Sequence, residues 1–138
     1  MSDTPNPPTP GPSPKPGSIS TPAPGTVPDP ADVEKNKVMA LLAYLGPLFL
    51  VPLLAATDSP YARFHANQGL NVFLLYIVIT IVTVPGACFM GLLTAGVGAC
   101  LCIPFYFVPL IWSVMGIINA SSGKMNALPL IGTITLIK

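Results

Sequence analysis

Apolar residues form long uninterrupted stretches in this chain, and charged residues are confined to short segments between them. From Ala66 to Gly123 the sequence runs for 58 residues without an Asp, Glu, Lys or Arg. A helix rises about 1.5 Å per residue, so this stretch is long enough to cross the roughly 30 Å hydrocarbon core of a bilayer more than twice. The pattern predicts a protein that resides in a membrane.

Three apolar stretches are each long enough to form one transmembrane helix. They cover residues 38–57, 70–90 and 99–120, and each contains at least one proline. Proline is tolerated in membrane helices when neighbouring groups satisfy the freed carbonyls, so we expect kinked spans. Small residues dominate 91–98, where we expect the turn between the last two helices. The predicted fold class is an all-α membrane protein with three transmembrane helices.

The polar residues that flank these stretches fit helix ends. Asp32 is a suitable N-cap for the first helix. Asp58 or Ser59 can cap the second helix, because Pro60 fits the first helical position, where its missing N–H costs nothing. Small and polar residues at 121–124 are expected to end the third helix.

The two ends of the chain differ in composition from the apolar region. Residues 1–31 are rich in proline, which fixes φ and removes backbone donors, and they contain no aromatic residue that could build a core. We expect a disordered tail over 1–31 and a helical transmembrane domain over 32–138. The last stretch, 125–138, is apolar but too short to cross, so we expect it to lie at the membrane interface or to pack back on the helices.

Composition and charge exclude several classes of protein. Only 8% of the 138 residues are charged, against about a quarter in soluble domains. A net charge of +1 gives no reason to expect nucleic-acid binding. Cys88, Cys100 and Cys102 are odd in number and lie in apolar sequence, so a disulfide framework is not expected. With three crossings, three basic residues fall on each side of the membrane, and the orientation stays open.

Most polar groups of the membrane domain lie in one short segment, just before the second apolar stretch. On a helix, Arg63, Asn67 and Asn71 recur at four-residue spacing and form one polar stripe. Polar side chains that enter a membrane tend to face a helix bundle, a wet cavity or lipid head groups. The candidate functional or assembly motif therefore comprises Arg63, Phe64, His65, Asn67, Gln68 and Asn71.

His65 is the only histidine in the chain, and its neighbours limit what it can do. A metal site needs further His, Cys or carboxylate ligands, and a general base needs a nucleophile and an orienting partner. Neither set is recognisable, so no cofactor, metal or catalytic residue is expected. A hydrogen-bonded interfacial histidine is favoured over a pH sensor or a proton relay. Replacing Arg63 or Asn67 by Ala is expected to impair assembly more than replacing His65.

Several motifs resemble those of a known family of membrane proteins. They are Lys35-Asn36-Lys37, Leu41-Leu42-Ala43-Tyr44, Asp58-Ser59-Pro60, the run Arg63-Phe64-His65-Ala66-Asn67-Gln68-Gly69 and, near the end, Leu128-Pro129-Leu130-Ile131-Gly132. Over roughly residues 33–138 the chain is similar to small bacterial integral membrane proteins of unknown function. These are grouped with the twenty-kilodalton chloroplast inner-envelope import component of the Tic translocon. The resemblance implies a multi-pass helical membrane protein.

The leading hypothesis is a non-enzymatic, multi-pass integral membrane protein of unknown molecular activity, located in the bacterial inner membrane. It would be a structural or accessory component of a membrane complex, with the lipid bilayer, a second copy or other membrane proteins as partners. The alternative is a pore or transporter subunit for protein import or small-solute passage, in which the stripe of Arg63, Asn67 and Asn71 lines a wet path. An intramembrane enzyme is disfavoured, because no paired carboxylates, Ser/His arrangement or metal cluster is recognisable.

Overall fold

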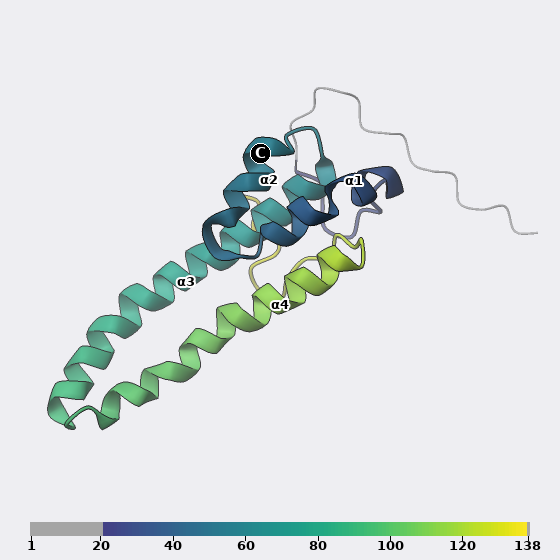
Figure 1. Ribbon diagram of the computed structural model, residues 1–138. Helices are drawn as coiled ribbons and strands as arrows, with labels where there is room; N and C mark the ends of the chain where they lie inside the picture. The colour runs from purple at the N-terminus through teal and green to yellow at the C-terminus, as the bar shows by residue number, and fades with distance from the viewer. Residues whose placement is uncertain (1–20, 138) are drawn as a thin grey trace, which may run out of the picture.

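The computed structural model describes residues 21–137, and this part of the chain is helical without a strand (Figure 1). The predicted all-α class is therefore confirmed. In chain order the elements are α1 (Pro30–Leu42), the 3₁₀-helix η1 (Gly46–Phe49), α2 (Leu50–Ala55), α3 (Pro60–Leu93), the 3₁₀-helix η2 (Val97–Tyr106) and α4 (Phe107–Ser121).

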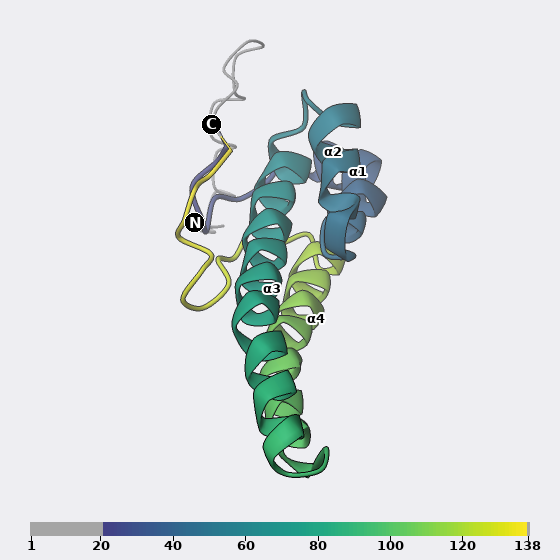
Figure 2. The same ribbon diagram turned by 90° about the vertical axis from the view of Figure 1, so that its left-hand side faces the viewer.

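A long hairpin forms the axis of the molecule. α3 runs in one direction, and η2 followed by α4 returns alongside it, as Figures 1 and 2 both show. The turn between them falls where the small-residue stretch predicts it, at Thr94–Gly96. Ala95 and Gly96 both have positive φ there, 52° and 93°, and glycine adopts such a conformation without strain. The other elements gather at the opposite end of the hairpin.

Two helical segments in the described residues are long and apolar enough to cross a membrane. They are Pro60–Leu93 and Val97–Ser121, and only 11% of the most apolar window of each is buried inside the protein. The second and third predicted spans lie within these two segments. Because the core helices of soluble proteins are mostly buried, such exposure favours a lipid-facing hairpin.

The first predicted span, 38–57, is not one continuous helix, and the expectation of three transmembrane helices is not confirmed. α1 ends at Leu42, and the chain restarts as the short helices η1 and α2. The break has a local cause. Gly46 has a left-handed φ of 64°, and Pro47, which follows it, has no backbone N–H to continue a helix. The apolar stretch is thereby divided into pieces that pack on the hairpin instead of forming a third long helix.

The start of α1 differs from the prediction. Asp29, not Asp32, is the N-cap, and its carboxylate accepts a hydrogen bond of 2.9 Å from the backbone N–H of Ala31. Pro30 occupies the first helical position, which places the cap one residue before it. Asp32 instead accepts a hydrogen bond from the backbone N–H of Tyr61, 3.1 Å away in the first turn of α3. An acidic group predicted to cap its own helix therefore tethers α1 to the next long helix.

The other predicted helix ends are confirmed. Ser59 caps α3 by accepting a 3.0 Å hydrogen bond from the N–H of Ala62, with Pro60 at the first position. α4 ends at Ser121, and Gly123 follows with a φ of 66°. The backbone N–H of Lys124 then donates to the carbonyl of Asn119 at 2.9 Å, and this hydrogen bond across the last turn is that of a Schellman motif.

Buried residues concentrate where α1, the first part of α3 and the end of α4 meet. We call this part of the protein, residues 21–72 and 116–137, the head, and residues 73–115 of the hairpin the stem. Two glycines allow the close contacts. A Cβ on Gly69 would lie 1.9 Å from the carbonyl oxygen of Ala43, and one on Gly116 would lie 2.1 Å from the ring of Tyr44. The core cluster of buried apolar residues in the head comprises Ala40, Ala43, Tyr44, Phe49, Tyr61, Phe64, Val72, Ala120, Met125 and Leu128.

The segments before α1 and after α4, within the described residues, meet on one side of the head (Figure 2). Figure 2 shows the segment before α1 beside the segment after α4, where the N–H of Gly25 donates to the carbonyl of Met125 at 2.7 Å. Of the tail predicted over 1–31, residues 1–20 lie outside the described residues. Residues 21–29 are described and precede α1 without forming a helix.

Candidate functional site

Two asparagines of the predicted polar motif hold the final residues of the described chain. The side-chain oxygen of Asn67 accepts hydrogen bonds from the backbone N–H groups of Leu136 and Ile137, at 2.7 and 3.0 Å. The amide nitrogens of Asn67 and Asn71 both donate to the carbonyl of Ile134, at 2.8 and 2.7 Å. Side chains one turn apart on α3 thus bind the same point of a segment more than 60 residues further along.

Gln68 and Asn71 hold the preceding part of the same segment. Gln68 is almost fully buried, and its amide nitrogen donates to the carbonyl of Gly132 at 2.8 Å. Its side-chain oxygen accepts from the N–H of Leu128 at 3.3 Å. Asn71 also donates to the carbonyl of Ile131, at 3.0 Å. Each amide therefore uses its hydrogen-bonding capacity on backbone groups.

We call Asn67, Gln68 and Asn71 the amide clamp. The segment it binds has turns but no helix, so its backbone groups need partners from elsewhere in the protein. Amide side chains supply them, because each carries both a donor and an acceptor. The C-terminal segment accordingly packs back on the helices, which was one of the two positions predicted for it.

His65 sits in an aromatic cage at the centre of the head. Its ring is fully buried, and its Nδ1 lies 2.9 Å from the hydroxyl of Tyr44. The rings of Tyr61 and Phe64 meet it edge to face, with centroids 4.7 and 5.3 Å away. Nε2 has no hydrogen-bond partner by geometry among the described residues. Burial lowers the pKa of His65 to about 4, against a smaller opposing effect of the Lys124 backbone. His65 is hydrogen-bonded as predicted, but in the protein interior rather than at an interface.

Tyr44 and Tyr61 are the residues that the sequence reasoning missed. Burial, with a smaller contribution from Tyr61, raises the pKa of the Tyr44 phenol well above its usual value, so the hydroxyl stays protonated. The hydroxyl of Tyr61 donates to the carbonyl of Ala120, which links α3 to the end of α4. In the sequence, Tyr61 begins the polar segment and Tyr44 belongs to a motif that resembles the known family, but neither position indicates a buried contact.

The structure brings the six predicted residues together on one short stretch of α3, and all six are buried. The clamp residues face the C-terminal segment, while Phe64 and His65 belong to the core beneath α1. Arg63 is 8% exposed and lies in the same turn. Within residues 21–137, no three His, Cys, Asp or Glu residues form a group that could hold a metal. The arrangement consists of hydrogen bonds and ring contacts that join distant parts of the chain. What these residues do in the structure is hold the fold of the head together.

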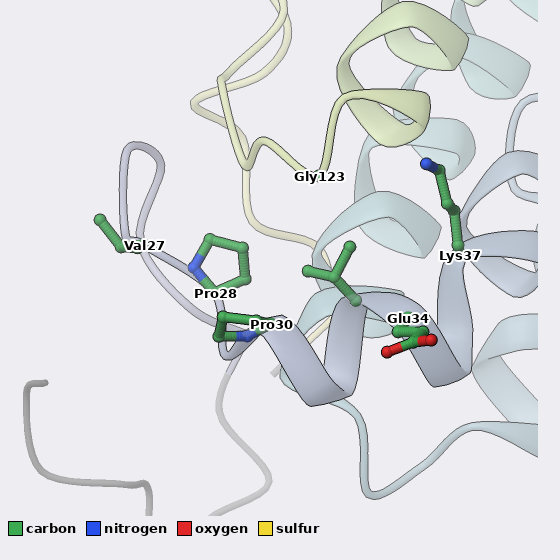
Figure 3. Close-up of a pocket in the computed structure, with 7 residues that line it drawn as sticks. Val27, Pro28, Pro30, Glu34, Lys37 and Gly123 are labelled. Atoms are coloured by element: carbon green, nitrogen blue, oxygen red, sulfur yellow. The ribbon is translucent and has the colours of Figure 1, made fainter.

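Figure 3 shows an open depression on the surface of the head, with a volume of about 490 Å³. Val27, Pro28 and Pro30 from the segment before α1 form one wall, and Glu34 and Lys37 project from α1. The two charged side chains are exposed and of opposite sign. The depression therefore has no net charge with which to select an ion.

Replacing Tyr44 by Phe is expected to lower the stability of the head by about 1–3 kcal/mol, because a buried imidazole nitrogen loses its hydrogen bond while the ring packing is kept. Thermal unfolding in detergent, followed by circular dichroism, measures this. Tyr76→Phe is the matched control, since Tyr76 is 45% exposed on the stem. An equal effect of the two changes would show that the Tyr44–His65 contact contributes nothing to stability.

These features define a class of protein: a membrane-associated helical protein with a packed head on an apolar hairpin. The chain belongs to the Magnetosome magnetite crystal formation protein family, whose family model matches residues 35–136.

Individual relatives agree with the family match. The chain is 32% identical over 100 residues to Magnetosome protein MmsF of Paramagnetospirillum magneticum. This match covers 70% of this chain and 82% of that protein. It is 32% identical over 97 residues to Magnetosome protein MamF of Magnetospirillum gryphiswaldense, covering 70% and 79%. A shorter match, 48% identical over 40 residues, is to MamF of Paramagnetospirillum magneticum and covers 29% and 36%. No solved structure matches the chain.

The family match corrects the resemblance drawn from the sequence. The motifs at 58–60, 63–69 and 128–132 suggested kinship with the Tic import component, but the matching family and the relatives are magnetosome proteins. The alternative of a pore or transporter subunit, which rested on the stripe of Arg63, Asn67 and Asn71 as well as on that resemblance, is withdrawn too, because the matching family is one of magnetite crystal formation.

Proposed function

We propose that this protein is a multi-pass component of the magnetosome membrane that takes part in magnetite crystal formation without catalysing a reaction. The observation that carries the proposal is the extent of the family match. Residues 35–136 include most of α1, the whole hairpin and the C-terminal segment up to its contacts with the amide clamp. The family assignment therefore applies to the folded unit as a whole.

The dimensions of the stem support a hairpin that crosses the membrane twice. α3 is 34 residues long, and its buried residues are concentrated in Tyr61–Val72, inside the head. The remainder, residues 73–93, comprises 21 residues and is about 31 Å long at 1.5 Å per residue. This length matches the hydrocarbon thickness of a bilayer, about 30 Å. The head would then lie at one membrane surface and the turn at Thr94–Gly96 at the other.

The distribution of basic residues supports one orientation for such a hairpin. All six Lys and Arg residues fall outside the stem, at positions that precede or follow it. Two crossings place all of them on the same side, whereas three crossings would divide them equally. Because Lys and Arg are retained on the cytoplasmic side, the head would face the cytoplasm.

Fusions to the C-terminus test this orientation. We expect green fluorescent protein attached after Lys138 to fluoresce, because it would fold in the cytoplasm, and alkaline phosphatase at the same position to be inactive. The opposite pair of results would contradict a cytoplasmic head.

The partners in this proposal are lipid and other membrane proteins. Large apolar side chains on the stem are exposed, including Val82 at 68% and Leu101 at 69%. Such a surface needs either lipid tails or an apolar protein face against it. Other magnetosome membrane proteins, or a second copy of this chain, would supply the protein face.

Inactivation of the gene in the source organism tests the proposed function. We expect fewer or smaller magnetite crystals, measured by electron microscopy of whole cells. The wild-type gene and a Gly86→Ala variant should restore them, since Gly86 has open space around it. Crystals of unchanged number, size and shape in the inactivated strain would contradict the proposal.

A further inference from the structure

A cavity of about 360 Å³ lies at the junction of the head and the stem. It is open to the surface and is lined by the break after α1, by α3 at the level of Gly69 to Tyr76, and by the region where η2 passes into α4. We call it the junction cavity. Its size falls within the usual range for a ligand pocket, roughly 300–1,000 Å³. Residues that line it from these three elements include Tyr44, Gly69, Phe73, Tyr106, Leu110 and Ser113.

The walls of the junction cavity are suited to an apolar occupant. Gly46, Pro47 and Gly69 add little side-chain volume to the lining, and Val72 and Phe73 of α3 line it with apolar side chains. Four lining residues carry hydroxyls. Two of these hydroxyls are engaged, that of Tyr44 with His65 at 2.9 Å and that of Tyr106 with Thr83 at 2.7 Å, and those of Tyr76 and Ser113 are the remaining polar groups of the lining side chains. A water molecule in such a cavity needs two to four polar partners, and engaged hydroxyls are poor ones.

The position of the cavity indicates what surrounds it. Phe73 begins the stem, the part of α3 whose length matches the hydrocarbon layer, and Leu110 is 55% exposed on the facing helix. Leu45, beside the break, is 52% exposed. The cavity is thus continuous with the apolar surface that would contact lipid. A hollow at this level left without atoms would lose dispersion contacts along its whole lining.

We propose that the junction cavity binds one acyl chain of a membrane phospholipid. This inference rests on the proposed placement of the hairpin in a bilayer, because only there do acyl chains reach the opening. The bound chain packs between the broken first segment and the hairpin, and it supports the head from the membrane side.

Native mass spectrometry of the full chain in detergent, titrated with palmitoyl-oleoyl phosphatidylglycerol, tests the inference. Wild-type protein is expected to retain one lipid above the level of random adducts. Ser113→Phe places a ring in the cavity and should reduce this adduct at least fivefold. The matched control, Ile111→Phe, adds the same ring at a position that is 56% exposed on the same helix, and it should retain the adduct. Equal lipid retention by the two variants would overturn the proposal, as would a protein dimer without bound lipid.

A second measurement does not depend on the folding of the variants. Wild-type protein in vesicles that contain a phospholipid with a photoactivatable acyl chain is irradiated, and the labelled residues are located by mass spectrometry. Labelling concentrated at 69–76 and 106–113 supports the site, whereas labelling spread evenly over the stem overturns it. A single cysteine at Ala95, tested with a maleimide that cannot cross membranes, separates the two levels of failure, because only an inserted hairpin places the turn on the opposite side from the head. A correctly inserted hairpin without a bound lipid refutes only the lipid site, and a hairpin that does not insert refutes the membrane placement itself.

Discussion

Replacing Gly69 by Ala is expected to disrupt the head more than any other single-methyl change on α3. The added Cβ would lie 1.9 Å from the carbonyl oxygen of Ala43 and 2.7 Å from its carbonyl carbon. Both are backbone atoms, so no side-chain rotation can relieve the overlap and α1 must move away from α3. Overpacking of this kind costs about 1–3 kcal/mol, and a backbone contact places Gly69→Ala at about 3 kcal/mol or more.

The same helix provides the matched control for this prediction. Gly86 lies on α3, and a Cβ added to it would meet nothing within 4 Å, so Gly86→Ala should be neutral or stabilising by up to about 1 kcal/mol through helix propensity. Thermal unfolding of both variants in detergent, with limited proteolysis of the head, gives the comparison. Equal melting temperatures for Gly69→Ala and Gly86→Ala would refute the close packing of α1 on α3.

Removing two members of the amide clamp is expected to release the C-terminal segment while leaving the hairpin intact. The double variant Asn67→Ala, Asn71→Ala deletes five hydrogen bonds to the backbone of Ile131, Ile134, Leu136 and Ile137. At a net value near 1 kcal/mol each, with partial replacement by water, the loss of about 3 kcal/mol corresponds to roughly 100-fold faster exchange of the protected amides. Hydrogen exchange read by mass spectrometry at Leu136 and Ile137 measures it.

Asn119→Ala serves as the control for the clamp. Its side chain makes a single long contact, 3.4 Å, to the carbonyl of Asn126, so the exchange rate at residues 136–137 should stay at the wild-type value. If the double variant also exchanges at the wild-type rate, the amides do not hold the segment.

The structure also changes the expectation for His65. The sequence suggested an interfacial residue that would tolerate replacement better than Arg63 or Asn67. A fully buried ring bounded by Tyr44, Tyr61 and Phe64 leaves a cavity when truncated, and large-to-small changes in cores cost about 2–5 kcal/mol. His65→Ala should therefore destabilise the head as severely as the removal of Asn67.

Local signals in the sequence were sufficient to predict the ends of the two long helical segments and the turn of the hairpin. Ser59 with Pro60, and the small residues around Gly123, act on their own neighbours, and the structure uses both as the sequence indicates. Proline was a poorer guide to helix ends, because this residue type lies within one helix and at the break that follows another. Pro85 lies inside α3, whereas Pro47 follows a glycine with positive φ and stands at a break. The φ of Gly46 and the packing of α1 on α3 decide the second case, and neither can be obtained from the residue types alone.

Long-range partners account for what the sequence could not show. The polar motif on α3 was visible as a pattern, but Asn67, Gln68 and Asn71 bind backbone atoms of residues 128–137, and residue types do not indicate which backbone atoms are bound. Asp32 was assigned to its own helix for the same reason, since its partner at Tyr61 is 29 residues away. Sequence periodicity identifies a face that needs a partner, and only the fold identifies the partner.

A hairpin that crosses the membrane twice, with the whole head on one side, underlies both the proposed function and the lipid site. Single cysteines at Ala31, Thr57 and Ala95, all exposed positions, test this directly after Cys88, Cys100 and Cys102 are replaced by Ala. A maleimide that cannot cross membranes is applied to sealed vesicles of each orientation. Two crossings predict that Ala31→Cys and Thr57→Cys react from the same side and Ala95→Cys from the other. Reaction of Ala31→Cys and Thr57→Cys from opposite sides would mean that the first apolar segment crosses as well, and would contradict the two-span hairpin.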